Sequence, residues 1–168
     1  PREGKSGGAW CTIFAAQEKY NGKDKRPQVS VVFNFTKPTA TTPSLLSLDQ
    51  VSIFLHEFGH ALHWLLSDVT YSSLSGASVY RDFVELPSQI MEYWAFEEEF
   101  LNTFAVHYQT GEQIPQELVQ KINEVHTFNG AYRLVSQLRL GMLDLAWHSI
   151  SSPVDVPVQQ FERQVLEQ

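Results

Sequence analysis

The sequence lacks several features that would place a protein in a special class. It has a single cysteine, Cys11, so it cannot form an internal disulfide and shows no dependence on an oxidising compartment. No apolar run approaches the roughly 20 residues of a membrane span, and the first residues have no signal-peptide pattern. These absences favour a cytoplasmic protein with no membrane partner, in which Cys11 is a small buried hydrophobe rather than a reactive thiol.

Positive charge is also scarce. The 12 Lys and Arg residues stand against 19 Asp and Glu, which gives a formal net charge of -7, the wrong sign for binding a phosphate backbone. We therefore expect no nucleic-acid partner. Hydrophobic residues make up 43% of the chain and charged residues 18%, as is typical of a globular protein. Because the chain does not begin with Met, we expect it to be a piece of a longer protein.

The first 45 residues have the pattern of short strands separated by turns. β-prone runs at 9–15 and 29–35 lie on either side of the turn-like residues 21–24, and they predict two strands in a hairpin or small sheet. Such strands can also offer an edge to an extended peptide, and a plain structural hairpin is the equal alternative. Residues 36–44 are rich in Thr and Pro and predict a loop.

A helical pattern begins after this loop. Ser47 and Gln50 match a capping box, in which each side chain satisfies a backbone N–H near the start of the helix. The apolar-periodic run that follows predicts a helix to about Ser67.

A second helix is predicted from Asp82 toward Phe104. Asp82 and Glu85 again resemble a capping box. Pro87 lies about one turn inside this helix, where it should distort the backbone locally.

The remainder of the chain is also predicted to be helical. Pro115 suits the first turn of a helix to about residue 126, residues 131–150 predict another, and Pro157 suits the start of a short last helix. No linker divides the chain. We therefore expect one domain, mainly α with a small N-terminal β-hairpin or sheet: strands and loop at 1–45, helices at 46–150 and a tail helix at 151–168.

Two histidines four residues apart, His56 and His60, lie on the first predicted helix. At this spacing both imidazoles project from one face, one turn apart, and can reach one metal ion at about 2.0–2.1 Å. Glu57 is about 100° further round the helix, where its carboxylate can reach an attacking water without becoming a ligand. The motif predicts a zinc site with Glu57 as general base.

The histidines are expected on the side of this helix that faces away from the core. With His56 at 0° and about 100° per residue, His60 falls at about 40°. Apolar residues gather at about 180° to 240°, namely Val51, Phe58, Leu62 and Leu65. A packed apolar back and a polar front are what the floor of a cleft requires.

A catalytic zinc site needs a third protein ligand. A metzincin-type site uses a histidine ten residues after the first, but that position is Leu66. A carboxylate from the following helix is the alternative, and spacing alone leaves Asp82, Glu85 and Glu92 open.

These motifs resemble the zinc oligopeptidase family of thimet oligopeptidase, oligopeptidase A and peptidyl-dipeptidase Dcp. The resemblance rests on residues 56–63, on residues 82–89 with Glu92 and Trp94, and on residues 2–5 and 34–35. It implies a fragment of a gluzincin-type metallopeptidase catalytic core that binds one Zn²⁺ per chain. It also implies that Glu85 is the third zinc ligand, beside His56 and His60.

The resemblance further implies hydrolysis of short peptides. Zinc polarises the scissile carbonyl, and Glu57 takes a proton from the attacking water and passes it to the leaving amine. Of the family's branches, we favour the Dcp branch, whose members release C-terminal dipeptides. Family members also have a Gly- and Tyr-rich loop that supplies donors to the oxyanion, and no such loop precedes Gln168. The alternative is a catalytically incomplete zinc-binding helical module.

Other polar residues near the motif have plainer interpretations. Gln89 and Glu92 lie one and two turns past Glu85 and are candidates for orienting the zinc histidines, because a metal-bound imidazole usually donates its other N–H. His63 is expected to pack or to form a supporting hydrogen bond rather than to bind metal.

Overall fold

The computed structural model describes residues 3–167, which form two compact units divided between Val119 and Gln120. The division falls inside a helix and not at either of the predicted boundaries, near residues 45 and 150, so the assignment of one domain stays a prediction.

The first unit begins with the predicted hairpin. Strands β1 (Trp10–Ala15) and β2 (Gln28–Val32) pair antiparallel, with Trp10 opposite Val32 and a bulge between Ile13 and Ala15. Their connection contains a short 3-10 turn, η1 (Tyr20–Gly22). The side chains of β1 alternate between exposed and half-buried, as in a strand with one covered face.

Helix α1 (Leu48–Leu65) follows the loop, as predicted. The capping box is present, because the Ser47 hydroxyl accepts from the backbone N–H of Gln50 at 3.3 Å and the Gln50 side chain accepts from the N–H of Ser47 at 3.1 Å. The chain then passes through a 3-10 turn, η2 (Ser72–Leu74), toward the second helix.

The predicted start of the second helix at Asp82 is wrong. Residues 81–85 form turns, and α2 (Leu86–Glu92) begins with Glu85 at its N-cap. Pro87 therefore lies in the first turn, where a missing N–H breaks no helical hydrogen bond, and the distortion expected there does not arise.

The helix is interrupted further along instead. A 3-10 turn, η3 (Tyr93–Phe96), continues α2, and Glu97 then adopts an extended conformation with φ -80° and ψ 124°. Glu97 caps a separate helix, α3 (Glu98–Phe104), so the single helix predicted toward Phe104 consists of three pieces.

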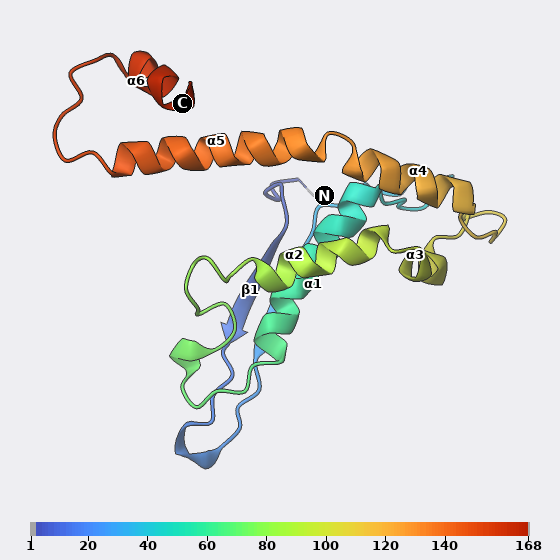
Figure 1. The fold of residues 1–168 in the computed structure, drawn as a ribbon. Helices are drawn as coiled ribbons and strands as arrows, with labels where there is room; N and C mark the ends of the chain where they lie inside the picture. Colours follow the sequence, from blue (N-terminus) through green and yellow to red (C-terminus); the bar gives the residue numbers. More distant parts are fainter. Residues whose placement is uncertain (1–2, 168) are drawn as a thin grey trace. The chain divides into compact units, whose positions relative to one another are not determined.

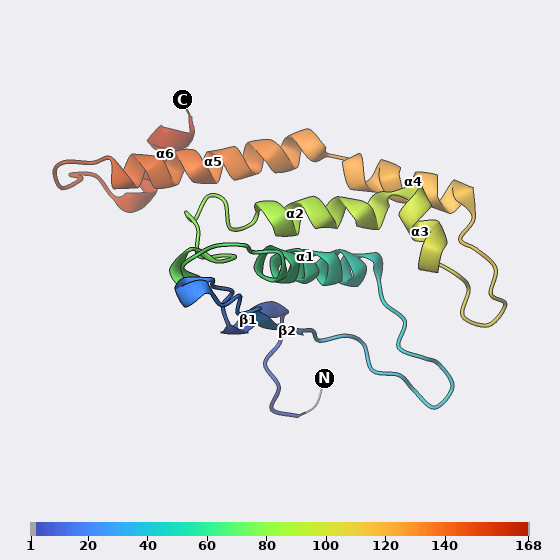
Figure 2. The same cartoon turned by 90° about the horizontal axis from the view of Figure 1, so that it is seen from below.

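Helix α1 lies between the sheet on one side and α2 on the other (Figures 1 and 2). The predicted apolar back is only partly covered, since Phe58 is 37% exposed and Leu65 is 40% exposed. The buried residues of α1 are Leu55, Glu57, Gly59 and Ala61. The difference arises because the helix is covered on two flanks, by α2 and by the strands, and not along a single stripe.

The second unit is helical. Helix α4 (Gln116–Thr127) spans the division, and α5 (Gly130–His148) and α6 (Val158–Leu166) follow it, close to the predicted positions. The rings of Trp147 and Phe161 join α5 to α6, with centroids 4.4 Å apart. Over the described residues, none of the helices is both long enough and apolar enough to cross a membrane.

Candidate metal centre

Three predicted ligand residues converge at the surface of α1 that borders α2. The Nε2 atoms of His56 and His60 lie 3.3 Å and 3.1 Å from Oε2 of Glu85. The ligand atoms of the three residues all lie within 4.8 Å of one another. The two histidines are on α1 and Glu85 is the N-cap residue of α2, so the cluster depends on the contact between these helices.

The geometry of the cluster fits a metal ion. Donors bound to a tetrahedral zinc at about 2.0–2.2 Å stand about 3.3–3.5 Å apart, close to the two nitrogen–oxygen distances here. Two imidazoles and one carboxylate also form the ligand set of many catalytic zinc sites, in which a fourth position stays open. The residues present therefore fit one divalent metal.

Close packing of the two helices brings Glu85 to the histidines. Gly59 lies between His56 and His60 on α1, and the backbone of α2 at Pro87 and Ser88 lies against it. A Cβ added at Gly59 would lie 2.6 Å from the carbonyl oxygen of Pro87 and 2.6 Å from the Cα of Ser88. Glycine is thus required at this position for α2 to approach as closely as it does.

Sequence reasoning missed Ser88, which holds the Glu85 side chain. The Ser88 hydroxyl is fully buried and lies 2.8 Å from Oε2 of Glu85 and 3.0 Å from its backbone carbonyl. A serine in the first turn of a helix is weak evidence for such a contact, because serine is common near helix starts for other reasons.

Glu92 contacts His56 on the side of the ring away from the cluster. Its Oε1 lies 2.6 Å from Nδ1 of His56. When Nδ1–H donates to this carboxylate, Nε2 keeps its lone pair and faces the cluster. Of the two orienting candidates from the sequence, Glu92 makes this contact, whereas Gln89 is exposed. Of the three carboxylates that spacing left open, Glu85 is the one in the candidate metal cluster of the described residues, and Asp82 is not part of it.

Glu57 is buried in the wall of a cavity of about 390 Å³ that the three candidate ligands also line. It is 7% exposed. Strand β1 forms another wall, where Cys11 lies beside Glu57, and burial together with the negative charge of Glu57 raises the pKa of the Cys11 thiol. Cys11 is half-buried and lines the cavity, so it is more accessible than the small buried hydrophobe that the sequence predicted.

His63 faces a different cavity, of about 420 Å³, lined mostly by apolar side chains. Its ring packs against Phe83, with centroids 6.0 Å apart, and its Nδ1 atom is buried without a hydrogen-bond partner. Burial, and then the nearby His60, lower the pKa of His63. The packing role expected for His63 agrees with this position.

Comparison with known proteins places these residues in a family. The family model described as "Peptidase family M3" matches residues 1–167. The chain belongs to peptidase family M3. M3 is a metallopeptidase family, so the resemblance inferred from the two motifs is confirmed, and so is the mainly helical fold with a small N-terminal sheet.

The relatives that match the chain include enzymes named dipeptidyl carboxypeptidase and oligopeptidase A. The chain is 39% identical to the dipeptidyl carboxypeptidase of Salmonella typhimurium, over 98% of this chain and 24% of that protein. It is 42% identical to the dipeptidyl carboxypeptidase of Escherichia coli, over 89% of this chain and 22% of that protein. Oligopeptidase A of Escherichia coli is 38% identical over 90% of this chain and 23% of that protein. The chain thus spans about a quarter of the length of these relatives.

Proposed function

We propose that this chain supplies the zinc-binding catalytic region of a peptidase that cleaves short peptides. The observation that carries the proposal is the convergence of His56, His60 and Glu85 beside the buried Glu57, in a chain of peptidase family M3. The relatives named dipeptidyl carboxypeptidase and oligopeptidase A support a peptide substrate.

His56 and His60 would hold the zinc ion through Nε2, and Glu85 would hold it through Oε2. When bound, the zinc polarises the scissile carbonyl and lowers the pKa of water at the open position to about 7. Glu92 keeps His56 in the tautomer that can bind a cation, and Ser88 keeps the Glu85 carboxylate turned toward the histidines.

Glu57 moves the proton. Its carboxylate takes a proton from the attacking water while the water oxygen forms a bond to the carbonyl carbon. The same carboxyl group then gives that proton to the amine nitrogen as the C–N bond breaks, which restores the carboxylate. The buried position of Glu57 in the cavity wall supports this role, because water excluded from the wall cannot compete for the proton.

We favour release of C-terminal dipeptides over internal cleavage. The two relatives at 39% and 42% identity carry the name dipeptidyl carboxypeptidase. Peptides with free and amidated C-termini separate the two activities when products are identified by mass spectrometry. Release of dipeptides from the free peptide alone supports the proposal, and internal cleavage of both peptides contradicts it.

A second candidate is a zinc-binding module that lacks part of the catalytic machinery. The described residues that line the cavity include no Tyr, Arg or Lys side chain to stabilise an oxyanion. Loss of one such donor lowers the rate by about 10²–10³-fold in known enzymes. This candidate predicts stoichiometric zinc without appreciable turnover by the 168-residue chain.

Metal analysis and one variant test the proposal. Elemental analysis of the purified chain should find one zinc, and Glu57→Gln should keep that zinc. In a longer protein that contains this chain and cleaves peptides, the same substitution should lower kcat by about 10²–10⁴-fold. Absence of zinc contradicts both candidates, and full turnover by Glu57→Gln contradicts the role of this residue.

A further inference from the structure

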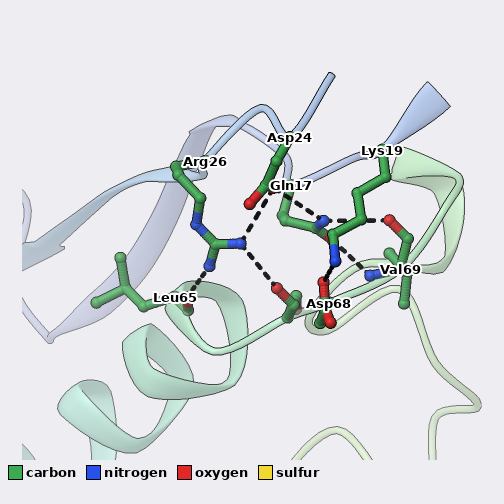
Figure 3. A network of polar contacts seen from close by, with 8 residues as sticks. Gln17, Lys19, Asp24, Arg26, Leu65, Asp68 and Val69 are labelled. Atoms are coloured by element: carbon green, nitrogen blue, oxygen red, sulfur yellow. Dashed lines mark hydrogen bonds and ion pairs between the residues drawn. The ribbon is translucent and has the colours of Figure 1, made fainter. Parts of the chain in front are cut away.

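A cluster of polar contacts joins the connection between β1 and β2 to the chain just after α1 (Figure 3). We call it the hairpin clamp. On the hairpin side it consists of Gln17, Lys19, Asp24 and Arg26, and on the other side of Leu65, Ser67, Asp68 and Val69.

Gln17 is the centre of the clamp. It is fully buried, and its side-chain amide pairs with both backbone groups of Val69. The carbonyl oxygen of the side chain accepts from the Val69 N–H at 2.8 Å, and the side-chain NH₂ donates to the Val69 carbonyl at 3.1 Å. The NH₂ group also lies 3.5 Å from a carboxylate oxygen of Asp24. An apolar side chain here would leave two backbone groups of Val69 unsatisfied.

Arg26 adds a second attachment, at the end of α1. Its guanidinium donates to the carbonyl of Leu65 at 2.6 Å and to that of Ser67 at 3.3 Å. The last carbonyls of a helix have no partners within the helix and carry partial negative charge, so a cation is favourable there. Asp24, at 3.3 Å, holds the guanidinium from the other side.

The ion pair between Lys19 and Asp68 is the solvent-exposed part of the hairpin clamp. The hydrogen bond with Asp68 raises the pKa of Lys19, and the same bond lowers the pKa of Asp68. The backbone N–H of Lys19 also donates to the carbonyl of Thr70 at 3.1 Å.

The clamp ties together two elements, β1 and α1, that both line the candidate active-site cavity. Gln17 lies two residues after the end of β1, which carries Cys11, and Leu65 is the last residue of α1, which carries Glu57. Fixing these ends limits how far the strand can move from the helix.

We propose that Gln17 is a positioning residue, which acts with Arg26 to hold β1 at its distance from Glu57. The width of the cavity at the general base then depends on contacts at the far end of the hairpin. The consequence for catalysis rests on the proposed function of Glu57. The mechanical role of the clamp does not, because it follows from the attachment of β1 to α1.

Cys11 provides a direct readout of this distance. It is the single cysteine of the chain, and it lies half-buried on β1 beside Glu57. If Gln17→Leu releases the end of β1, Cys11 should react with N-ethylmaleimide about tenfold faster at fixed pH, as expected when two buried hydrogen bonds are lost. The affinity for Co²⁺ should stay within about twofold of the original, because the three candidate ligands lie on α1 and α2 and not on β1.

General loss of stability must be separated from local release. Leu101→Ala is the matched control, because Leu101 is 3% exposed, lies on α3 and takes no part in the clamp. Cys11 reaction rates of both variants are compared with their unfolding equilibria in urea. The proposal expects the reaction rate of Cys11 to rise in Gln17→Leu by more than the loss of stability in that variant explains. In Leu101→Ala, any rise in the rate should match the loss of stability. Identical behaviour of the two variants overturns it.

Two substitutions of Arg26 test the clamp independently, and they replace the first test if Gln17→Leu does not fold. Arg26→Met should accelerate the reaction of Cys11, and Arg26→Lys, which keeps a cation near the carbonyls of α1, should restore a slower rate. Equal rates in the two variants contradict the proposal. So does a Co²⁺ affinity that falls as Cys11 becomes reactive, because the clamp would then act on the ligand helix. Failure of the original chain to bind Co²⁺ contradicts the proposed function alone.

Discussion

The carboxylate of Glu92 lies 2.6 Å from Nδ1 of His56, a contact that would leave Nε2 free to bind a cation. We therefore predict that Glu92→Leu weakens zinc binding by about 10–100-fold, which is the usual effect of removing such a partner. Competition with a chromophoric chelator measures the dissociation constant. Gln89→Leu is the control, because Gln89 is an exposed residue of the same helix, and its zinc affinity should not change. An unchanged affinity in Glu92→Leu would show that the contact does not orient His56.

His63 should make the stability of the chain depend on pH. Burial lowers its pKa in the folded protein below the ordinary value of 6.5. The unfolded chain therefore binds more protons between the two pKa values, so the free energy of unfolding rises with pH through this window. It falls as the pH drops from the ordinary pKa to the folded one. We predict that His63→Phe removes this part of the pH dependence.

Urea unfolding at several pH values on either side of 6.5 tests the prediction for His63, with the original chain and the variant compared at each pH. His148→Gln serves as the control, since His148 is exposed. The interpretation fails if the variant and the original chain keep parallel curves.

Single residues could be placed from the sequence where one helix sets their relative positions, and could not where packing between helices sets them. The relation of His56, Glu57 and His60 is set by the period of one helix, so the sequence alone placed them on one element. Spacing could not identify Glu85 as the third ligand, because the segment between α1 and α2 could bring the second helix to the first in many ways. That choice rested on the family resemblance. The contact of Ser88 with Glu85 depends on tertiary packing and has no distinct sequence pattern.

The contact between α1 and α2 is the element-level feature on which the candidate site depends. Gly59→Ala would place a methyl group against the backbone at Pro87 and Ser88, so one helix must shift. We predict a loss of about 1–3 kcal/mol in the free energy of unfolding. Zinc affinity should fall as well, because Glu85 moves with α2.

Gly141 gives a matched comparison for this substitution. It lies inside α5, and a Cβ added there meets nothing within 4 Å. Gly141→Ala should therefore stabilise the chain by about 0.5–1 kcal/mol, since alanine loses less backbone entropy on folding. Chemical denaturation of both variants measures the two effects. A neutral or stabilising Gly59→Ala would show that the helices are not held in close contact.

Elements were predicted well where their signals are local and poorly where packing decides. The capping box at Ser47 and Gln50 located α1, and turn residues located the hairpin. The similar pattern at Asp82 and Glu85 was misleading, because it does not show whether the backbone between them is helical or turned. The covered faces of α1 were also misjudged, since helical periodicity does not reveal that two different elements flank it.

At the scale of the whole molecule, a metal bound at the cluster would add a link between α1 and α2, which pack together but are separated in the chain by residues 66–85. Any ligand that binds only the folded state stabilises it, by about 2.7 kcal/mol at a concentration 100 times its dissociation constant. We predict that zinc raises the midpoint of thermal unfolding and that a chelator lowers it. His60→Ala should abolish the response, and a response that persists in this variant would place the metal elsewhere.

The division into two units was not predictable from the chain. Its boundary falls within α4, where no glycine, proline or polar run marks it. Sequence patterns record where elements begin and end, whereas the grouping of elements depends on which faces meet. The family could be recognised all the same, because its motifs lie entirely in the first unit.

The candidate ligands differ in the rigidity of their supports. His56 and His60 lie in an 18-residue helix, whereas Glu85 is half-exposed and caps a helix of 7 residues that follows a run of turns. Fraying at the end of the shorter helix is therefore the easiest way to open the cluster. We expect Glu85 to detach first whenever the cation leaves, so that the lifetime of the bound ion reports how often the first turn of α2 unwinds.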